Sequence, residues 1–147
     1  MPFQDESDLA ITRLSGIITT IERDLLYLLS LEEKKAEYRY LRVIEEDVSL
    51  TAVTGLRTFF ISRNCKLVSL SGYIVDESSS GDVTIQLYDV GASANLLTSP
   101  LTILAGANVG ALSLTSHIDL TAGDIIRVDC VSAGTGVKGL DIEIKII

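Results

Sequence analysis

The sequence is poor in aromatic residues, holds a single histidine and has no tryptophan, and each shortage narrows the possible functions. Aromatic residues make up only 5% of the chain. Tryptophan is the side chain that most often stacks on sugar rings or bases, so its absence weakens, without excluding, a carbohydrate-binding role. With His117 alone, a metal site would depend on carboxylates and a Ser/His/Asp relay would have one possible base. We therefore expect an ordinary, partly exposed histidine.

Basic residues and long apolar runs are also in short supply. The chain carries 12 Lys and Arg against 20 Asp and Glu, a formal net charge of -8. Without a basic stripe to neutralise phosphates, we expect no nucleic-acid partner. No apolar run approaches the roughly 20 residues that a membrane-spanning helix needs, so no membrane partner is expected either.

The two cysteines, Cys65 and Cys130, lie far apart in a chain that begins Met-Pro-Phe-Gln-Asp-Glu, without a charged-then-apolar leader. This favours reduced, buried thiols over a disulfide. Both cysteines fall inside strand patterns, and neither has a flanking histidine or basic cluster to lower the pKa of its thiol. A Cys/His nucleophilic pair is therefore not expected.

Two loops deserve weighing as ligand sites. Residues 76–82 (DESSSGD) offer carboxylates beside a glycine, as hard cations require, but lack the alternate spacing of a calcium loop and favour a solvated hairpin turn. Gly134, Gly136 and Gly139 precede no helix and so do not form a phosphate-binding loop. The sequence thus predicts no catalytic residue, no cofactor and no metal ion, and we expect the chain not to be an enzyme.

The N-terminal third has the pattern of a self-associating helix. Between Asp8 and Ser30 the apolar residues alternate strictly by three and four, which is a heptad repeat. Isoleucine occurs at both the a and the d positions, which favours trimers over dimers. The predicted oligomer interface, called the heptad seam below, consists of Ile11, Leu14, Ile18, Ile21, Leu25 and Leu28.

The alternative for this segment is an amphipathic helix that folds back on its own domain, because three heptads are close to the lower limit for a coiled coil. The pattern stops after Leu31, and residues 32–37 (EEKKAE) are typical of a solvated helix end or connector. Ser30 with Glu33 could also form a capping box that restarts a turn. We place the helical, oligomerising segment at residues 1–37 and a second domain at 38–147.

From Tyr38 onward the period of hydrophobicity changes from 3.6 to 2, and turn residues recur every eight to fifteen positions, which indicates an all-β domain. The predicted fold is mainly β, an antiparallel β-sandwich preceded by a coiled-coil-type α-helix, with the jelly roll as the leading topology. Strands are expected near residues 38–44, 48–53, 57–62, 66–75, 82–90, 96–104, 111–120, 124–131 and 140–146.

Period-2 alternation also assigns side chains to the core or to solvent. The core positions are Leu140, Ile142, Ile144 and Ile146, with Val83, Ile85, Leu87, Ile126, Val128 and Cys130. The solvent-facing positions are Asp141, Glu143 and Lys145, with Thr84, Gln86 and Tyr88.

Two segments carry a resemblance to a known group. Residues 120–144 (LTAGDIIRVDCVSAGTGVKGLDIEI) and 81–90 (GDVTIQLYDV) resemble small β-sandwich virion proteins of tailed bacteriophages, in which an "aGD" strand, a Gly/Thr turn and a "kGL" strand end the chain. A short helix ahead of such a sandwich is similar to trimeric capsid cement, decoration and fibre proteins. The resemblance implies a virion component with no catalytic residues to transfer.

The expected function is therefore a homotrimeric cement or head-decoration protein that stabilises a phage capsid. Its expected partners are further copies of the chain and the major capsid protein or another virion subunit, and its expected location is the virion, assembled in the host cytoplasm. The alternatives are a head or tail fibre tip that recognises a host surface, and a carbohydrate- or peptide-binding β-sandwich module.

Overall fold

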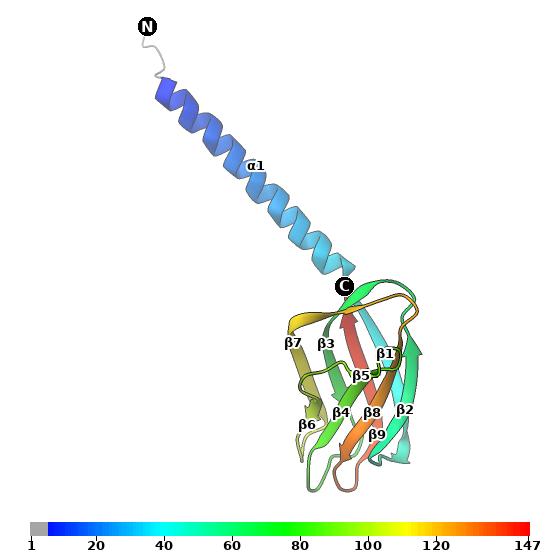
Figure 1. Ribbon diagram of the computed structural model, residues 1–147. Helices are drawn as coiled ribbons and strands as arrows, with labels where there is room; N and C mark the ends of the chain where they lie inside the picture. The colour runs from blue at the N-terminus through cyan, green and yellow to red at the C-terminus, as the bar shows by residue number, and fades with distance from the viewer. Residues whose placement is uncertain (1–5) are drawn as a thin grey trace. The chain divides into compact units, whose positions relative to one another are not determined.

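The computed structural model describes residues 6–147, apart from the side chains of residues 31–35. The chain divides into two compact units, one ending at Ala36 and the other comprising Glu37–Ile147. Within the described residues the first unit is one helix, α1 (Glu6–Lys35), and the second is built from nine strands (Figure 1). The predicted N-terminal helix and mainly β remainder are confirmed.

Helix α1 is continuous over its 30 residues, a length of about 45 Å at 1.5 Å per residue. The capping box considered at Ser30 does not restart a turn, because the Ser30 hydroxyl donates back to the carbonyl of Tyr27 at 2.8 Å. The helix also runs through Gly16, where an added Cβ would meet nothing within 4 Å. The heptad seam thus lies on one uninterrupted helix.

The strands differ from the predicted ones mainly at their ends. The first predicted strand continues to Ser49, so the separate strand expected at 48–53 is wrong, and the next strand begins only at Val53. Of the strand expected at 96–104, only Leu101–Ile103 is extended and paired. The nine strands are β1 (Glu37–Ser49), β2 (Val53–Phe60), β3 (Cys65–Tyr73), β4 (Val83–Asp89), β5 (Ala94–Asn95), β6 (Leu101–Ile103), β7 (Val109–Leu120), β8 (Ile125–Ala133) and β9 (Lys138–Ile146).

The strands form two antiparallel sheets. Sheet A has the order β1-β9-β3-β7, and sheet B has the order β2-β8-β4-β5 with β6 also pairing with β4. The pairing is nested: β1 pairs with β9, β2 with β8, β3 with β7 and β4 with β6. A chain paired in this way is one long antiparallel hairpin, wound so that successive rungs fall alternately in sheet A and sheet B.

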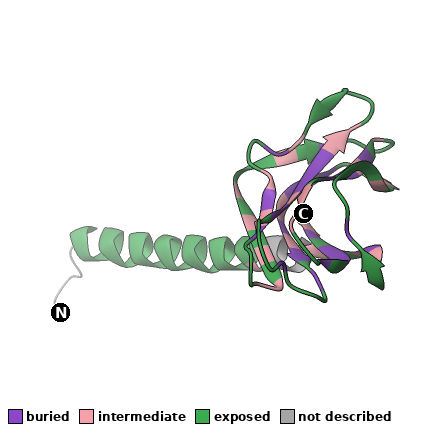
Figure 2. Ribbon diagram, turned by 90° about the horizontal axis from the view of Figure 1, so that it is seen from below, coloured by how far each residue is buried: buried purple, intermediate pink, exposed green. Residues whose placement is uncertain are grey.

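The two sheets enclose a single hydrophobic core, a sandwich-like arrangement. Figure 2 shows buried residues spread along the strands of the second unit, while the described part of α1 is coloured as exposed almost throughout. The ten predicted core positions are all buried, among them Cys130 at 3% exposure. Cys65 and Cys130 are both free and buried, as predicted.

Gly72 and Gly110 face each other across β3 and β7, where β6 packs against sheet A. A Cβ added at Gly110 would lie 2.2 Å from the carbonyl oxygen of Thr102, and one at Gly72 would lie 2.9 Å from a methyl group of Leu101. Only glycine fits at these two positions, because the side chain and backbone of β6 occupy the space. The two glycines therefore set how closely β6, which pairs with sheet B, approaches β3 and β7 of sheet A.

Two of the predicted solvent-facing residues are buried. Asp141 is 6% exposed and Gln86 is 8% exposed, so the prediction that both are solvent-exposed is wrong. Their side chains do point to the outer faces of their sheets, as alternation requires. Neighbouring side chains on sheet A and a covering segment on sheet B exclude the solvent from them.

Candidate interaction surfaces

The heptad seam is exposed along its whole length. Its six side chains are 48–63% exposed, and the adjoining Ile17, Leu26 and Leu29 are 55–67% exposed. Residues three and four positions apart lie on one face of a helix, so these side chains form a continuous apolar surface on α1. Monomeric proteins rarely expose a contiguous apolar surface of this kind unless it binds something.

The outer face of sheet A holds a buried carboxylate that sequence reasoning placed in solvent. The hydroxyl of Tyr40 donates to Asp141 Oδ2 at 2.6 Å, and Arg42 Nε donates to Asp141 Oδ1 at 3.2 Å. Arg42 also reaches Glu46 at 3.1 Å. The hydrogen bond to Asp141, with some desolvation, raises the pKa of Tyr40 above its ordinary value. The network therefore holds Tyr40 as a neutral donor with its ring fixed over the sheet.

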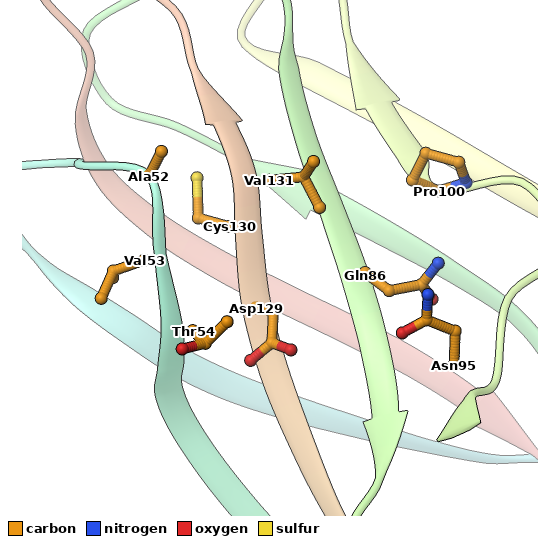
Figure 3. A pocket seen from close by; sticks show the side chains of 9 residues that line it. All are labelled: Ala52, Val53, Thr54, Gln86, Asn95, Pro100, Asp129, Cys130 and Val131. Carbon is orange, nitrogen blue, oxygen red and sulfur yellow. The ribbon is translucent and has the colours of Figure 1, made fainter. Parts of the chain in front are cut away.

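A hollow of about 580 Å³ lies on the outer face of sheet B, between the start of β2 and the segment around β5. Figure 3 shows its lining, in which the polar side chains Thr54, Asp129, Gln86 and Asn95 come from β2, β8, β4 and β5. Gln86 forms part of this lining, and its amide is fully engaged with the backbone: its Nε2 donates to the carbonyl of Leu97 at 3.0 Å, and its Oε1 accepts from the amide of Leu97 at 3.1 Å. The lining consists of Ala52, Val53, Thr54, Gln86, Asn95, Pro100, Asp129, Cys130 and Val131.

Asp129, the carboxylate of this hollow, is 6% exposed and accepts three hydrogen bonds from two residues. Arg127 binds it with two hydrogen bonds of 2.7 Å, and the amide of Gly55 donates to it at 2.7 Å. Burial tends to raise the pKa of Asp129, but the bonds from Arg127 and Gly55 outweigh it and hold that pKa below its ordinary value. The Arg127 guanidinium in turn stacks 4.2 Å from the ring centroid of Tyr88. This carboxylate is a charged structural anchor, poorly suited to proton transfer at neutral pH.

For one of the two buried carboxylates, Asp129, the sequence contains a pattern that could have predicted its partner. In the strand pattern Arg127-Val128-Asp129, the two charged residues are two positions apart and so project from the same face. Sequence reasoning treated that face only as the far side of a core strand. For Asp141 the partners come from β1, about 100 residues away in the chain, and alternation alone gives no access to such pairs.

The residues weighed as catalytic or metal-binding candidates lie apart. His117 is exposed on β7. Burial raises the pKa of the Cys65 thiol, and it raises that of Cys130 to about 11. In the 76–82 loop, Asp82 accepts from the amide of Ala105 at 3.0 Å. Across residues 6–147, side chains of 31–35 aside, no three His, Cys, Asp or Glu residues gather closely enough to hold a metal ion.

No helix in the part of the chain that the structure describes is long and apolar enough to cross a membrane.

The chain matches no family model and no curated protein sequence.

Proposed function

We propose that this chain is a non-enzymatic structural protein that self-associates, most simply as a homotrimer, through a coiled coil of its α1 helices. The observation that carries the proposal is the exposure of all six seam residues on one continuous helix. Burying a Leu or Ile side chain fully contributes about 1.5–3 kcal/mol, so six half-exposed side chains offer roughly 6 kcal/mol per chain on association. That is a large gain for a helix that otherwise leaves its apolar side chains in water.

The choice of a trimer comes from the side chains at each heptad position. With Ile11 at position a, positions a hold Ile11, Ile18 and Leu25, and positions d hold Leu14, Ile21 and Leu28. Isoleucine at both positions disfavours the two-stranded geometry. Ile17 and Leu29 flank the heptad seam and widen it, as suits a helix that contacts two neighbours.

For the second unit we propose the jelly-roll topology. The nested pairing of β1 with β9, β2 with β8, β3 with β7 and β4 with β6 supports it, because a jelly roll is a wound antiparallel hairpin of eight strands. Strand β5 is then a two-residue addition at the edge of sheet B. Viral capsid proteins are among the proteins that use this architecture.

We further propose that the protein acts in a tailed-phage virion as a capsid cement or head-decoration protein, with the major capsid protein as its partner. The support is the combination of a trimerising helix and a jelly roll, together with the sequence resemblance of residues 81–90 and 120–144. In that role, a trimer stabilises the shell by burying area across subunit boundaries, where a standard interface buries roughly 1,600 Å².

A binding module for sugars or peptides is the second candidate, and one observation favours it. Tyr38, Tyr40 and Tyr73 are 45–62% exposed and all project from the outer face of sheet A. Exposed tyrosines on one sheet can stack on sugar rings or pack on a peptide. Tyr38 and Tyr40 belong to β1, and Tyr73 belongs to β3.

Electron microscopy of purified phage particles that carry this protein tests the virion role. The proposal expects density for the chain at regular positions on the outer capsid lattice, with three copies around each site. Density confined to a tail or fibre tip would overturn the cement role in favour of host recognition. Absence of the protein from particles of the phage that encodes it would overturn the virion role altogether.

A further inference from the structure

The outer face of sheet A is an ordered array of side chains, set by the register of its four strands. Three rows of paired residues project from it, each row crossing β1, β9, β3 and β7. We call these twelve residues the tyrosine face. The rows are Tyr38, Lys145, Ser69 and Ser113; Tyr40, Glu143, Ser71 and Ala111; and Arg42, Asp141, Tyr73 and Val109.

The side chains of the first two rows of the tyrosine face are bulky on β1 and small on β3 and β7. Its β1 side carries Tyr38 and Tyr40, which are 59% and 62% exposed. Its β3 and β7 side carries, in the same two rows, only serines and an alanine. In these two rows, bulky aromatic side chains therefore lie at the β1 edge of the sheet and small side chains, on which a ring could lie, cover β3 and β7; the third row carries Tyr73 and Val109 on those strands.

The exposed tyrosines are held in place. Tyr40 is fixed by its 2.6 Å hydrogen bond to Asp141, and the ammonium group of Lys145 lies 5.6 Å from the ring centroid of Tyr38. A side chain that is already ordered loses little conformational entropy when a partner packs against it. Fixed, exposed aromatic rings are typical of the anchor residues of protein interfaces.

The charges of the tyrosine face also balance, although the chain as a whole is strongly acidic. Arg42 and Lys145 stand against Asp141 and Glu143, two of each sign, whereas the chain has a net charge of -8. Two copies that meet through acidic surfaces would repel each other. This face is one on which they can meet without that cost.

We propose that the occupant of the tyrosine face is a second copy of this chain, with Tyr38 and Tyr40 of one copy packing on Ser69, Ser71, Ala111 and Ser113 of the next. This inference rests on the proposed trimer. Only Ala36 separates the end of α1 from the start of β1, a span of about 7 Å at most. Parallel helices around a three-fold axis therefore hold the first residues of the three β1 strands close to that axis.

The shape of the face matches such an arrangement. A closed ring of three copies uses a heterologous contact, in which one surface of each copy meets a different surface of the next. The two unlike halves of the tyrosine face provide these two surfaces. A self-complementary dimer would use the same two halves reciprocally, with the tyrosines of each copy on the serines of the other, so sedimentation decides between two and three copies.

The area of the tyrosine face can be compared with the area that a stable interface buries. Three rows spaced by two residues along four strands cover about 400 Å², from the usual rise and strand spacing. A standard interface buries roughly 800 Å² per partner. Each contact uses one half of the tyrosine face from each copy, about 200 Å², which is about a quarter of a stable interface, and the helices must supply the rest.

Cross-linking of the full-length chain tests this contact. A Tyr38→Cys chain and a Ser69→Cys chain, co-expressed and treated with a short bis-maleimide, can be joined at these positions only between different copies. The control pair is Tyr38→Cys with Thr84→Cys, since Thr84 faces outward on sheet B. The unmodified chain is the blank, because its Cys65 and Cys130 are 7% and 3% exposed.

We expect a cross-link between positions 38 and 69, identified by mass spectrometry, from the first pair and no cross-link between positions 38 and 84 from the control, and we expect the first to vanish when Ile18→Asp and Ile21→Asp are added to both chains. A trimer by sedimentation in which positions 38 and 69 fail to cross-link would overturn the contact and leave the coiled coil standing. The tyrosine face would then be open for the sugar or peptide of the second candidate. A monomer by sedimentation would overturn both.

Discussion

The hydroxyl of Tyr40 and the carboxylate of Asp141 lie 2.6 Å apart on neighbouring strands of sheet A. The phenol is largely in solvent and the carboxylate is almost wholly buried. A buried carboxylate that loses a donor keeps the cost of its desolvation. The pair thus ties the position of an exposed aromatic ring to the stability of the strand pair β1–β9.

The substitution Tyr40→Phe tests whether this hydrogen bond stabilises the strand pair β1–β9. We expect the free energy of unfolding to fall by about 1–3 kcal/mol, because Asp141 Oδ2 loses its donor while Arg42 still donates to Oδ1. Urea denaturation followed by circular dichroism measures it. Tyr38→Phe, in which the ring near Lys145 is kept, is the matched control and should change stability by less than about 0.5 kcal/mol. Equal effects of the two substitutions would contradict the role of the hydrogen bond.

Asp129 predicts a pH dependence of stability. Because Arg127 and Gly55 hold its pKa below the ordinary value, the unfolded chain takes up a proton at a higher pH than the folded chain does. The stabilisation is therefore complete above the ordinary carboxyl pKa of about 3.9 and is lost as the pH falls through the lower, folded-state pKa.

Asp129→Asn should lower the free energy of unfolding at neutral pH and make its decline below about pH 4 shallower than in the unmodified chain. Urea unfolding of both chains at neutral pH and at about pH 3 gives the two slopes. Parallel slopes would mean that other carboxylates account for the acid sensitivity.

The close contact between Gly110 on β7 and strand β6 leaves no room for a larger side chain. In Gly110→Ala the new methyl group would lie 2.2 Å from the carbonyl oxygen of Thr102, so β6 or β7 must move. We expect a loss of about 3 kcal/mol, at the upper end for overpacking. Gly16→Ala is the control, because nothing lies within 4 Å of its added Cβ, and it should stabilise the helix by up to about 1 kcal/mol. A tolerated Gly110→Ala would show that β6 is not fixed there.

Much of this fold could be predicted because the physics behind it is local. The three–four alternation of Ile11 to Leu28 requires only a helix, and the alternation of Leu140 to Ile146 requires only one buried sheet face. Asp141 and Gln86 were misassigned for a non-local reason: alternation names the face of a side chain, and its burial depends on what covers that face. The covering groups are Tyr40 and Arg42 in one case and Leu97 in the other.

The strand ends were missed for a related reason. Leu50 looks like a strand residue in an apolar alternation, but it is buried in the connection between β1 and β2, where its amide binds the carbonyl of Val137 at 3.0 Å. Leu96 and Leu97 likewise extend an apolar run without continuing a strand. The side chain of Leu97 is buried in the core, and its backbone forms hydrogen bonds with the side-chain amide of Gln86.

The heptad seam gives the most direct prediction for assembly. Ile18→Asp with Ile21→Asp places charges at one a and one d position and should dissociate the oligomer, while the β signal in circular dichroism persists because the core of the second unit is separate from the seam residues. Thr19→Asp with Thr20→Asp is the matched control. It adds the same charge outside the heptad seam, at positions whose hydroxyls bind only the helix backbone, and should leave the oligomer intact.

The central claim is that the heptad seam joins copies of this chain, and sedimentation equilibrium of the unmodified, full-length chain at micromolar concentration tests it most directly. The account predicts a mass of three chains, shifting to one chain on Ile18→Asp with Ile21→Asp. A clean monomer for the unmodified chain would contradict it.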